Sequence, residues 1–445
     1  MKVTTEELTF DAGFTEENDL FNRRQLYNII TGLIKSSSDE SLVLSLADKW
    51  GSGKTSFIKM FQHENEIDKD SNFETIYFDA YENDYQNDPF LALASQIYGL
   101  LDKQNVDWDE IKNDFLEASK GLAKTFLKQS VKSGLNFVTA GIVNGPILDQ
   151  TVNMFKDSLN TSLDIYIDSK LKSSEQEKNT IVKFRESLLK ISEQKNKKII
   201  FIIDELDRAR PDFSLDLIEK IKHLFSVKGV VFLLVMNREQ FEESIKFRYG
   251  NIDSRLYLNK FIHFWFELPR KFNYENEDVT TLSYIEYLGK KNSFNQLTRE
   301  SIKTLSILLS LNNCTLREAE RCFSLISYLF KNKPINSNVS YFREYEDALV
   351  CAAFLKVTNP VLLKNISQRN ILYKDVLLKL NIPNQSSKHL LILMKTLEVE
   401  LMSKEEFLQQ IDKSEISEKY FFNGNRSDFF KSVSKCLELL SIENN

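Results

Sequence analysis

The sequence contains few of the residues that build metal centres and disulfide-stabilised proteins. It has four cysteines and four histidines in 445 residues. Cys314, Cys322, Cys351 and Cys436 form no C-x-x-C pair and have no histidine close by, so neither a zinc site nor a disulfide framework is indicated. We therefore expect free thiols in a reducing, cytoplasmic setting. His263 lies within an apolar run and is interpreted as a structural strand residue.

Glycine and proline are also scarce, with 13 and 7 residues. This scarcity favours helices over a turn-rich all-β architecture, and the 33 phenylalanines supply bulk for large cores. The chain has no excess of positive charge, because 58 Lys and Arg stand against 64 Asp and Glu. Non-specific nucleic-acid binding through net charge is therefore disfavoured, although a local basic face stays open.

Long apolar runs are missing as well. The N-terminus has no signal-peptide pattern. The best candidate for membrane contact, residues 133–148, is uncharged but contains Asn136, Asn144 and Pro146. It is shorter than the roughly 20 apolar residues that a membrane-spanning helix needs. We expect a helix hairpin or packed turn there, and no stable membrane insertion.

The most informative stretch runs from Leu46 to Thr55 and reads Leu-Ala-Asp-Lys-Trp-Gly-Ser-Gly-Lys-Thr. A predicted buried strand precedes it and a predicted helix follows, which is the context of a phosphate-binding P-loop. Gly51 and Gly53 would let backbone N–H groups turn inward around a phosphate. Lys54 is predicted to reach the β- and γ-phosphates, and the Thr55 hydroxyl to ligate Mg²⁺. Asp48 stands where the full motif has its first glycine, and aspartate tolerates unusual backbone angles.

A second apolar run, residues 198–203, ends in Asp204-Glu205-Leu-Asp-Arg208. Such a run indicates a central strand covered on both faces, as parallel sheets require. Doubly wound sheets bind ligands at the carboxyl ends of their strands. Asp204 is therefore predicted to hold the Mg²⁺ shell, and Glu205 to orient and deprotonate a water molecule aimed at the γ-phosphate.

The order of strand and helix patterns indicates an α/β fold, a P-loop NTPase parallel sheet with helices on both faces. Helices are expected at 22–35, from 88 and at 215–225. The expected strands are 41–47, 73–79, 198–203, 229–235 and 261–268. Amphipathic patterns that include Trp108 and Phe115 predict a helical insert at 104–197. We expect an NTPase core at 1–103 and 198–270, and a helical C-terminal domain at 279–445.

With these motifs located, the chain resembles the KAP family of P-loop NTPases, in the AAA-like and STAND-like group. Trp50-Gly-Ser-Gly-Lys-Thr-Ser56 looks like the family's Walker A loop, and Phe78-Asp-Ala-Tyr81 like its second-strand signature. Ile203-Asp-Glu-Leu-Asp-Arg208 resembles its Walker B region. Further matching segments are Arg210-Pro211, Ile221-Lys-His-Leu-Phe225, Val235-Met-Asn-Arg-Glu-Gln240, Tyr257-Leu-Asn-Lys-Phe-Ile262 and Leu268-Pro269.

The resemblance implies an ATP-binding core with strand order 5-1-4-3-2 and ATP and Mg²⁺ as cofactors. It implies a polar sensor at the end of the fourth strand, here Asn237. It also implies an arginine of the helical domain that contacts nucleotide. Arg317 is the candidate for this role, and an ordinary surface arginine on a helix is the alternative. The loop residues that the resemblance assigns to ATP binding are Trp50, Gly51, Ser52, Gly53, Lys54, Thr55 and Ser56.

We interpret the chain as a Mg²⁺-dependent ATPase that switches an assembly. By family analogy it acts with protein partners in bacterial defence against phages or plasmids. A membrane-associated organiser and a non-hydrolysing nucleotide-binding scaffold are the alternatives, and Glu205 argues against the scaffold. A GTPase is disfavoured, because Asn237-Arg-Glu-Gln240 lacks the aspartate that pairs with guanine.

Two arginines near the acidic strand end raise the question of a homo-oligomer. Arg208 and Arg210 follow the acidic pair closely. One of them could face the nucleotide of a neighbouring protomer, as arginine fingers do. A local salt bridge from Arg208 to Asp207 or Asp212 is the alternative.

Overall fold

The structure is a computed structural model of the chain. It describes residues 13–37, 41–68, 72–86, 88–102, 109–132, 163–272, 278–294, 296–332, 343–383, 388–413, 415–417, 420–422, 425–426 and 428–438. Its residue contacts divide the chain into two compact units. The helical unit comprises 1–26, 49–60 and 268–445, and the sheet unit comprises 27–48 and 61–267.

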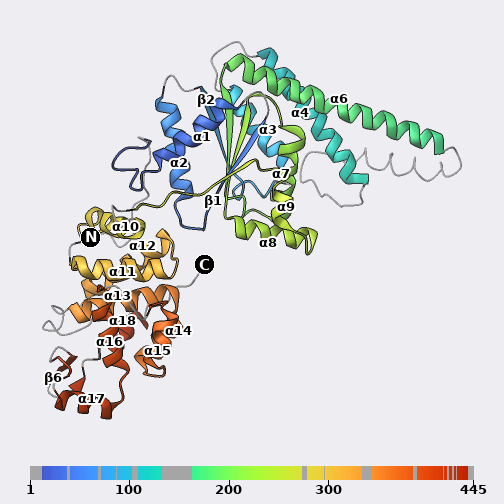
Figure 1. Cartoon of the computed structure of the whole chain (residues 1–445). Coiled ribbons are helices and arrows are strands. Elements are labelled where there is room, and N and C mark those ends of the chain that lie inside the picture. Colours follow the sequence, from blue (N-terminus) through green and yellow to red (C-terminus); the bar gives the residue numbers. More distant parts are fainter. Residues whose placement is uncertain are drawn as a thin grey trace. The chain divides into compact units, whose positions relative to one another are not determined.

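The sheet unit is built on five parallel strands (Figure 1). They are β1 (Leu42–Ala47), β2 (Phe73–Asp79), β3 (Lys198–Asp204), β4 (Val230–Met236) and β5 (Phe264–Phe266). Their order is β2-β3-β4-β1-β5, which confirms the predicted order 5-1-4-3-2. The fifth strand is shorter than the predicted 261–268, because the backbone N–H groups of Phe261 and Ile262 bond back to Leu258 O in a turn.

The central strands are buried on both faces, because helices cover the sheet on either side. Every residue of β4 is buried, as are six of the seven in β3. On one face phenylalanine rings form a continuous cluster. The rings of Phe201 and Phe232, which are partners in register, stack with centroids 5.0 Å apart. Phe225 and Phe90 extend this cluster toward the covering helices α7 (Pro211–Leu224) and α3 (Pro89–Asp102).

The two insert helices α4 (Asp109–Lys132) and α6 (Leu163–Lys195) run side by side (Figure 1). Phe115 on α4 and Phe184 on α6 are fully buried, with ring centroids 5.5 Å apart. Phe184 also contacts Phe90 and thereby joins the insert to the sheet's core. The amphipathic pattern around Phe115 thus packs as predicted. Trp108 and the segment 133–148 lie outside the described residues. Within the described ranges, no helix combines the length and apolarity needed to cross a bilayer.

Four further helices precede or follow the sheet's strands along the chain. They are α1 (Arg24–Ser36), α2 (Lys54–Ile67), α8 (Arg238–Tyr249) and α9 (Ser254–Leu258). Helix α1 begins two residues later than the predicted 22, because Asn22 has a positive φ of 57°. Asp19 then accepts hydrogen bonds from the backbone N–H groups of Arg23 and Arg24. Helix α7 begins earlier than the predicted 215, at Pro211, where the fixed φ of proline suits the first helical position.

Among the described residues from 268 onward, the helical unit contains nine helices. They are α10 (Thr280–Lys291), α11 (Arg299–Leu311), α12 (Leu316–Asn332), α13 (Arg343–Thr358), α14 (Pro360–Ser367), α15 (Tyr373–Lys379), α16 (Leu391–Leu401), α17 (Lys404–Asp412) and α18 (Phe429–Glu438). Helix α13 is buried along nearly its whole length, against α11, α12, α16 and α18. Two short strands that were not predicted from the sequence pair antiparallel; they are β6 (Phe421–Phe422) and β7 (Asn425–Arg426). All four cysteines are free.

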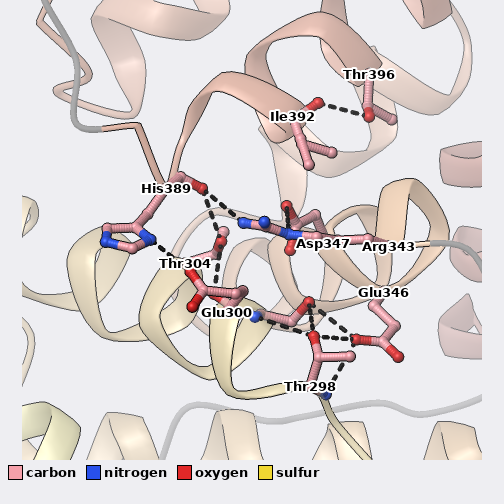
Figure 2. Close-up of polar contacts among 10 residues, drawn as sticks. Thr298, Glu300, Thr304, Arg343, Glu346, Asp347, His389, Ile392 and Thr396 are labelled. Carbon is pink, nitrogen blue, oxygen red and sulfur yellow. Dashed lines mark hydrogen bonds and ion pairs between the residues drawn. The ribbon is translucent and has the colours of Figure 1, made fainter.

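A buried polar cluster lies where α13 begins (Figure 2). Glu346 accepts hydrogen bonds from the Thr298 hydroxyl at 2.7 Å and the Ser301 hydroxyl at 3.0 Å. The neighbouring Asp347 is fully buried, 3.6 Å from the Arg343 Nε. Burial raises the pKa of Asp347 to about 6, although Arg343 and nearby hydroxyls oppose the shift. This carboxyl is therefore a group whose protonation is linked to folding.

Candidate nucleotide-binding site

The loop after β1 has the backbone that a phosphate-binding loop requires. Gly51 and Gly53 have φ values of +77° and +92°, which side-chain-bearing residues rarely adopt. A Cβ on Gly51 would lie 2.6 Å from the Arg317 Cβ, and one on Gly53 would lie 2.8 Å from an Arg23 nitrogen. Asp48 is not among the described residues with positive φ. The turn therefore needs no glycine there, which explains why the incomplete motif is tolerated.

Arg23, which was not predicted from the sequence, holds this loop from outside. The side chain is only 4% exposed. Its guanidinium donates hydrogen bonds to Ser52 O at 2.9 Å and to Gly53 O at 3.1 Å. In a trans peptide the carbonyl points opposite to the next N–H. Because Arg23 binds the carbonyls, the N–H groups of Gly53 and Lys54 face away from it, as a phosphate cradle requires.

Helix α12 meets the same loop at its first turn. The backbone N–H of Arg317 donates to Gly51 O at 3.2 Å. The turn itself is fixed by reciprocal capping, in which Glu318 accepts from Thr315 N at 2.7 Å and Thr315 Oγ1 accepts from Glu318 N at 3.4 Å. The Arg317 side chain is exposed. The structure thus places the backbone of this predicted nucleotide contact at the loop.

Lys54 is the first residue of α2, and its side chain is buried. Its ammonium donates to Lys49 O, at the start of the loop, at 3.0 Å. Thr55 and Ser56 follow in the first helical turn and are half-buried, whereas Trp50 is 40% exposed. The helical unit therefore brings together all seven predicted loop residues and Arg317.

Asp204 closes β3 at the carboxyl edge of the sheet and is only 1% exposed. One carboxylate oxygen accepts from the Tyr77 hydroxyl at 3.3 Å, and the other from the backbone N–H of Glu205 at 2.8 Å. Asp79, at the end of β2, is its partner in register. Burial and the negative charge of Asp204 both raise the pKa of Tyr77, so its hydroxyl stays a hydrogen-bond donor. Only the strand register reveals that Tyr77 and Asp79 are neighbours of Asp204.

Glu205 combines a strained backbone with a partly buried carboxylate. Its φ of +56° is unusual for a residue with a side chain, and such conformations cluster at functional sites. Burial raises the pKa of Glu205, the Arg208 guanidinium opposes the rise, and the charge of Asp204 adds to it. Arg208 Nε lies 2.7 Å from a Glu205 carboxylate oxygen. Glu205 is therefore a local ion-pair partner of Arg208 that was not predicted from the sequence.

The remaining predicted residues lie in the same part of the sheet unit. Asn237 follows β4, is 8% exposed, and occupies the N-cap position of α8 without capping it through its side chain. Asp48 N donates to Met236 O at 3.1 Å, which joins the carboxyl ends of β1 and β4. Arg210 donates from its backbone N–H to an Asp84 carboxylate oxygen at 2.9 Å. Asp204, Glu205, Arg208 and Asn237 therefore gather at one edge.

A family model described as the KAP family P-loop domain matches residues 23–329, more than half of the chain. The chain belongs to the KAP family of P-loop NTPases. The match begins at Arg23, the residue that holds the loop, and extends through α12 almost to its end. No curated protein matches the chain. Membership of this family and the parallel five-stranded sheet establish a P-loop NTPase fold, which implies nucleotide binding.

Several solved structures are distantly similar to this KAP protein. The ORC2 protein of Aeropyrum pernix, in ADPNP–ADP complexes, has 10% identity and a TM-score of 0.36, with 88% of this chain and 92% of that chain covered. The Aeropyrum pernix ORC1 protein in complex with DNA has 12% identity and a TM-score of 0.35, with 98% and 86% covered. Cdc6p from Pyrobaculum aerophilum has 9% identity and a TM-score of 0.38, with 94% and 93% covered.

Proposed function

We propose that this KAP protein binds ATP and hydrolyses it in a Mg²⁺-dependent reaction. The observation that carries the proposal is the loop between β1 and α2, where Gly51 and Gly53 adopt positive φ and the helix starts at Lys54. Their geometry exposes successive N–H groups at a helix N-terminus, and both features favour anions.

The residues present also fit the metal. Mg²⁺ prefers oxygen ligands, usually one or two protein groups with several waters. The Thr55 hydroxyl and the buried Asp204 carboxylate are donors of this type. Bound Mg²⁺ would neutralise charge on the phosphates. Lys54 would bind the β- and γ-phosphates, and Asn237 would serve as the polar sensor.

Glu205 is the proposed water-orienting base. Its carboxylate is partly buried, and this burial raises its pKa above the usual value for glutamate, which makes the carboxylate a stronger base. The ion pair with Arg208 orients the carboxylate. A scaffold that only binds nucleotide would have no use for a base in a strained backbone conformation, which favours turnover over the scaffold alternative.

Lys54→Ala tests the binding half of the proposal. It should weaken ATP binding by at least about ten-fold, equivalent to about 1.4 kcal/mol, because it removes the side-chain charge assigned to the β- and γ-phosphates. Lys59→Ala is the matched control, because Lys59 is exposed on the same helix. Isothermal titration would refute the loop assignment if both variants bound ATP like the parent.

Glu205→Gln tests the hydrolytic half. The variant should still bind ATP and lose about 10²–10⁴ in turnover, the usual contribution of a positioned base. Glu239→Gln, an exposed residue of α8, is the control. Phosphate release measured with and without Mg²⁺ decides. Unchanged turnover in Glu205→Gln would contradict the assignment of Glu205 as the base. Equal rates of phosphate release with and without metal would contradict the proposed Mg²⁺ requirement.

We further propose that the ATPase is a switch that acts with protein partners in bacterial defence against phages or plasmids. Support for this role comes from family analogy. The test is to express the intact locus in a bacterial host, with either the parent or the Lys54→Ala protein, and then to challenge the cells with phages and plasmids. Equal protection by both proteins would separate the nucleotide site from defence, and no protection by the parent would reject the role.

A further inference from the structure

Two neighbouring cavities lie in the sheet unit at the edge where the strands begin. The first has a volume of ≈ 560 Å³ and lies where β2, β3 and β4 begin. The second has a volume of ≈ 340 Å³ and is lined by residues of β1, α7 and the turn before β5. Lys228, just before β4, lines both. Because the strands are parallel, this edge is opposite to the one that carries Asp204 and Asn237.

Lysine is the most frequent residue type in the lining of both cavities. Lys35, Lys197, Lys198 and Lys228 line the first, and Lys222, Lys228 and Lys260 line the second. Glu193 is the single acidic residue that lines either one, within the described part of the chain. The whole chain carries a net charge of −6, so this edge is a local reversal of sign. A surface with such a focused field attracts anions.

The lysines differ in what else they do. The Lys198 ammonium donates to Ile34 O at 2.6 Å and Ser37 O at 2.8 Å, and so holds the C-terminal end of α1. Lys198 is therefore a structural residue. Lys35, Lys228 and Lys260 are exposed and come from three separate segments. Each reaches the surface at the edge of a cavity rather than in the core.

We propose that this lysine-lined edge binds the phosphodiester backbone of a nucleic acid. Lysine ammonium groups bind phosphates as point charges. A small phosphorylated ligand would occupy one cavity, whereas here the positive charge continues from one cavity to the next through Lys228. A continuous polyanion uses both cavities at once. The surface is separate from the nucleotide site, so the inference does not rest on the proposed ATPase activity.

Fluorescence anisotropy of the full chain with labelled oligonucleotides of about 20 nucleotides, single-stranded and duplex, tests this surface. The parent should bind with Kd of about 10⁻⁴–10⁻⁶ M at physiological salt. About four phosphate contacts predict a slope of log K against log[salt] of about −2.8 for the single strand and about −3.6 for the duplex. The two probes distinguish a single strand from a duplex as the source of the backbone. Failure of both probes to bind at low salt would overturn the proposal.

Charge reversal locates the surface. Lys35→Glu, Lys228→Glu and Lys260→Glu should each weaken binding at least about five-fold at low salt and make the salt slope shallower by about one. Lys183→Glu, an exposed residue of α6 outside both cavities, is the matched control. Thermal melting confirms that each variant is folded. If the control weakened oligonucleotide binding equally, the loss of affinity would follow from the change in net charge alone, and the proposed site would be refuted.

Tripolyphosphate supplies the opposing test. On the proposed surface, oligonucleotide binding depends on both Lys35 and Lys260, because the backbone spans the two cavities. If oligonucleotides do not bind but tripolyphosphate does, and if Lys35→Glu alone abolishes its binding, the first cavity is a small-ligand site and the polyanion proposal is wrong.

Discussion

Arg23→Ala should disable the phosphate loop without touching any residue that would contact nucleotide. The guanidinium donates to two loop carbonyls, Ser52 O at 2.9 Å and Gly53 O at 3.1 Å. The side chain is 4% exposed, so water does not readily replace these bonds. Hydrogen bonds from a charged group each contribute about 1.5–3 kcal/mol, and the two together therefore stabilise the loop by about 3–6 kcal/mol at most.

Only part of this free energy would appear as lost affinity, because the loop can be re-ordered by the ligand it binds. An affinity loss of about 10- to 100-fold for ATP, or about 1.4–2.7 kcal/mol, is expected. Arg23→Lys should lie between parent and alanine, because an ammonium cannot reproduce the planar fork of a guanidinium. Arg24→Ala is the control, since Arg24 is adjacent and exposed.

Isothermal titration with ATP, on proteins whose thermal melts confirm a folded state, measures the effect. If Arg23→Ala bound ATP as tightly as Arg24→Ala, the carbonyl contacts would not fix the loop, and the argument from peptide geometry would be refuted. A shift in melting temperature alone, with unchanged affinity, would assign Arg23 to stability.

Three further predictions concern pH, packing and assembly. Folding raises the pKa of Asp347 to about 6, so the stability of the wild type relative to Asp347→Asn should fall by on the order of 2–3 kcal/mol as pH rises from about 4 to about 6. Urea unfolding measures this difference, and a difference that does not change with pH would contradict the prediction. Phe184→Ala should cost about 3–5 kcal/mol in the same assay, because the fully buried ring joins the insert to the core. If Arg208 acts across a homo-oligomer, mixing Arg208→Ala and Glu205→Gln proteins should restore ATPase activity, whereas a strictly monomeric protein with no recovery would exclude that role.

The Arg208–Glu205 ion pair gives the mixing experiment its physical meaning. Within one chain, Arg208 Nε is 2.7 Å from the Glu205 carboxylate. An arginine that serves a neighbouring protomer would have to leave this partner, and the freed carboxylate would become a stronger base only if its burial persisted. Rescue on mixing would therefore report a rearrangement at the strand end as well as an interface.

Local patterns in the sequence determined most of the secondary structure and the outline of the site. Strand β2 lies at 73–79 as predicted, because an apolar and β-branched run fixes a strand with little help from the rest of the chain. Gly51 and Gly53 could be located for the same reason, since their positive φ is a local backbone requirement. The predicted ends of elements were wrong where hydrogen bonds outside the apolar sequence pattern set the boundary, as at Asp19 before α1 and at Leu258 before β5.

Contacts between residues distant in sequence were decided only by the tertiary structure. Arg23 lies 29 residues from Ser52, and no motif marks it. Tyr77 meets Asp204 because β2 pairs with β3 across the whole insert. The lysine-lined edge joins Lys35, Lys228 and Lys260, which the overall negative charge of the sequence conceals. A pattern of neighbours can specify backbone conformation, but which side chains meet depends on strand order and register, and these are set by burial of the whole core.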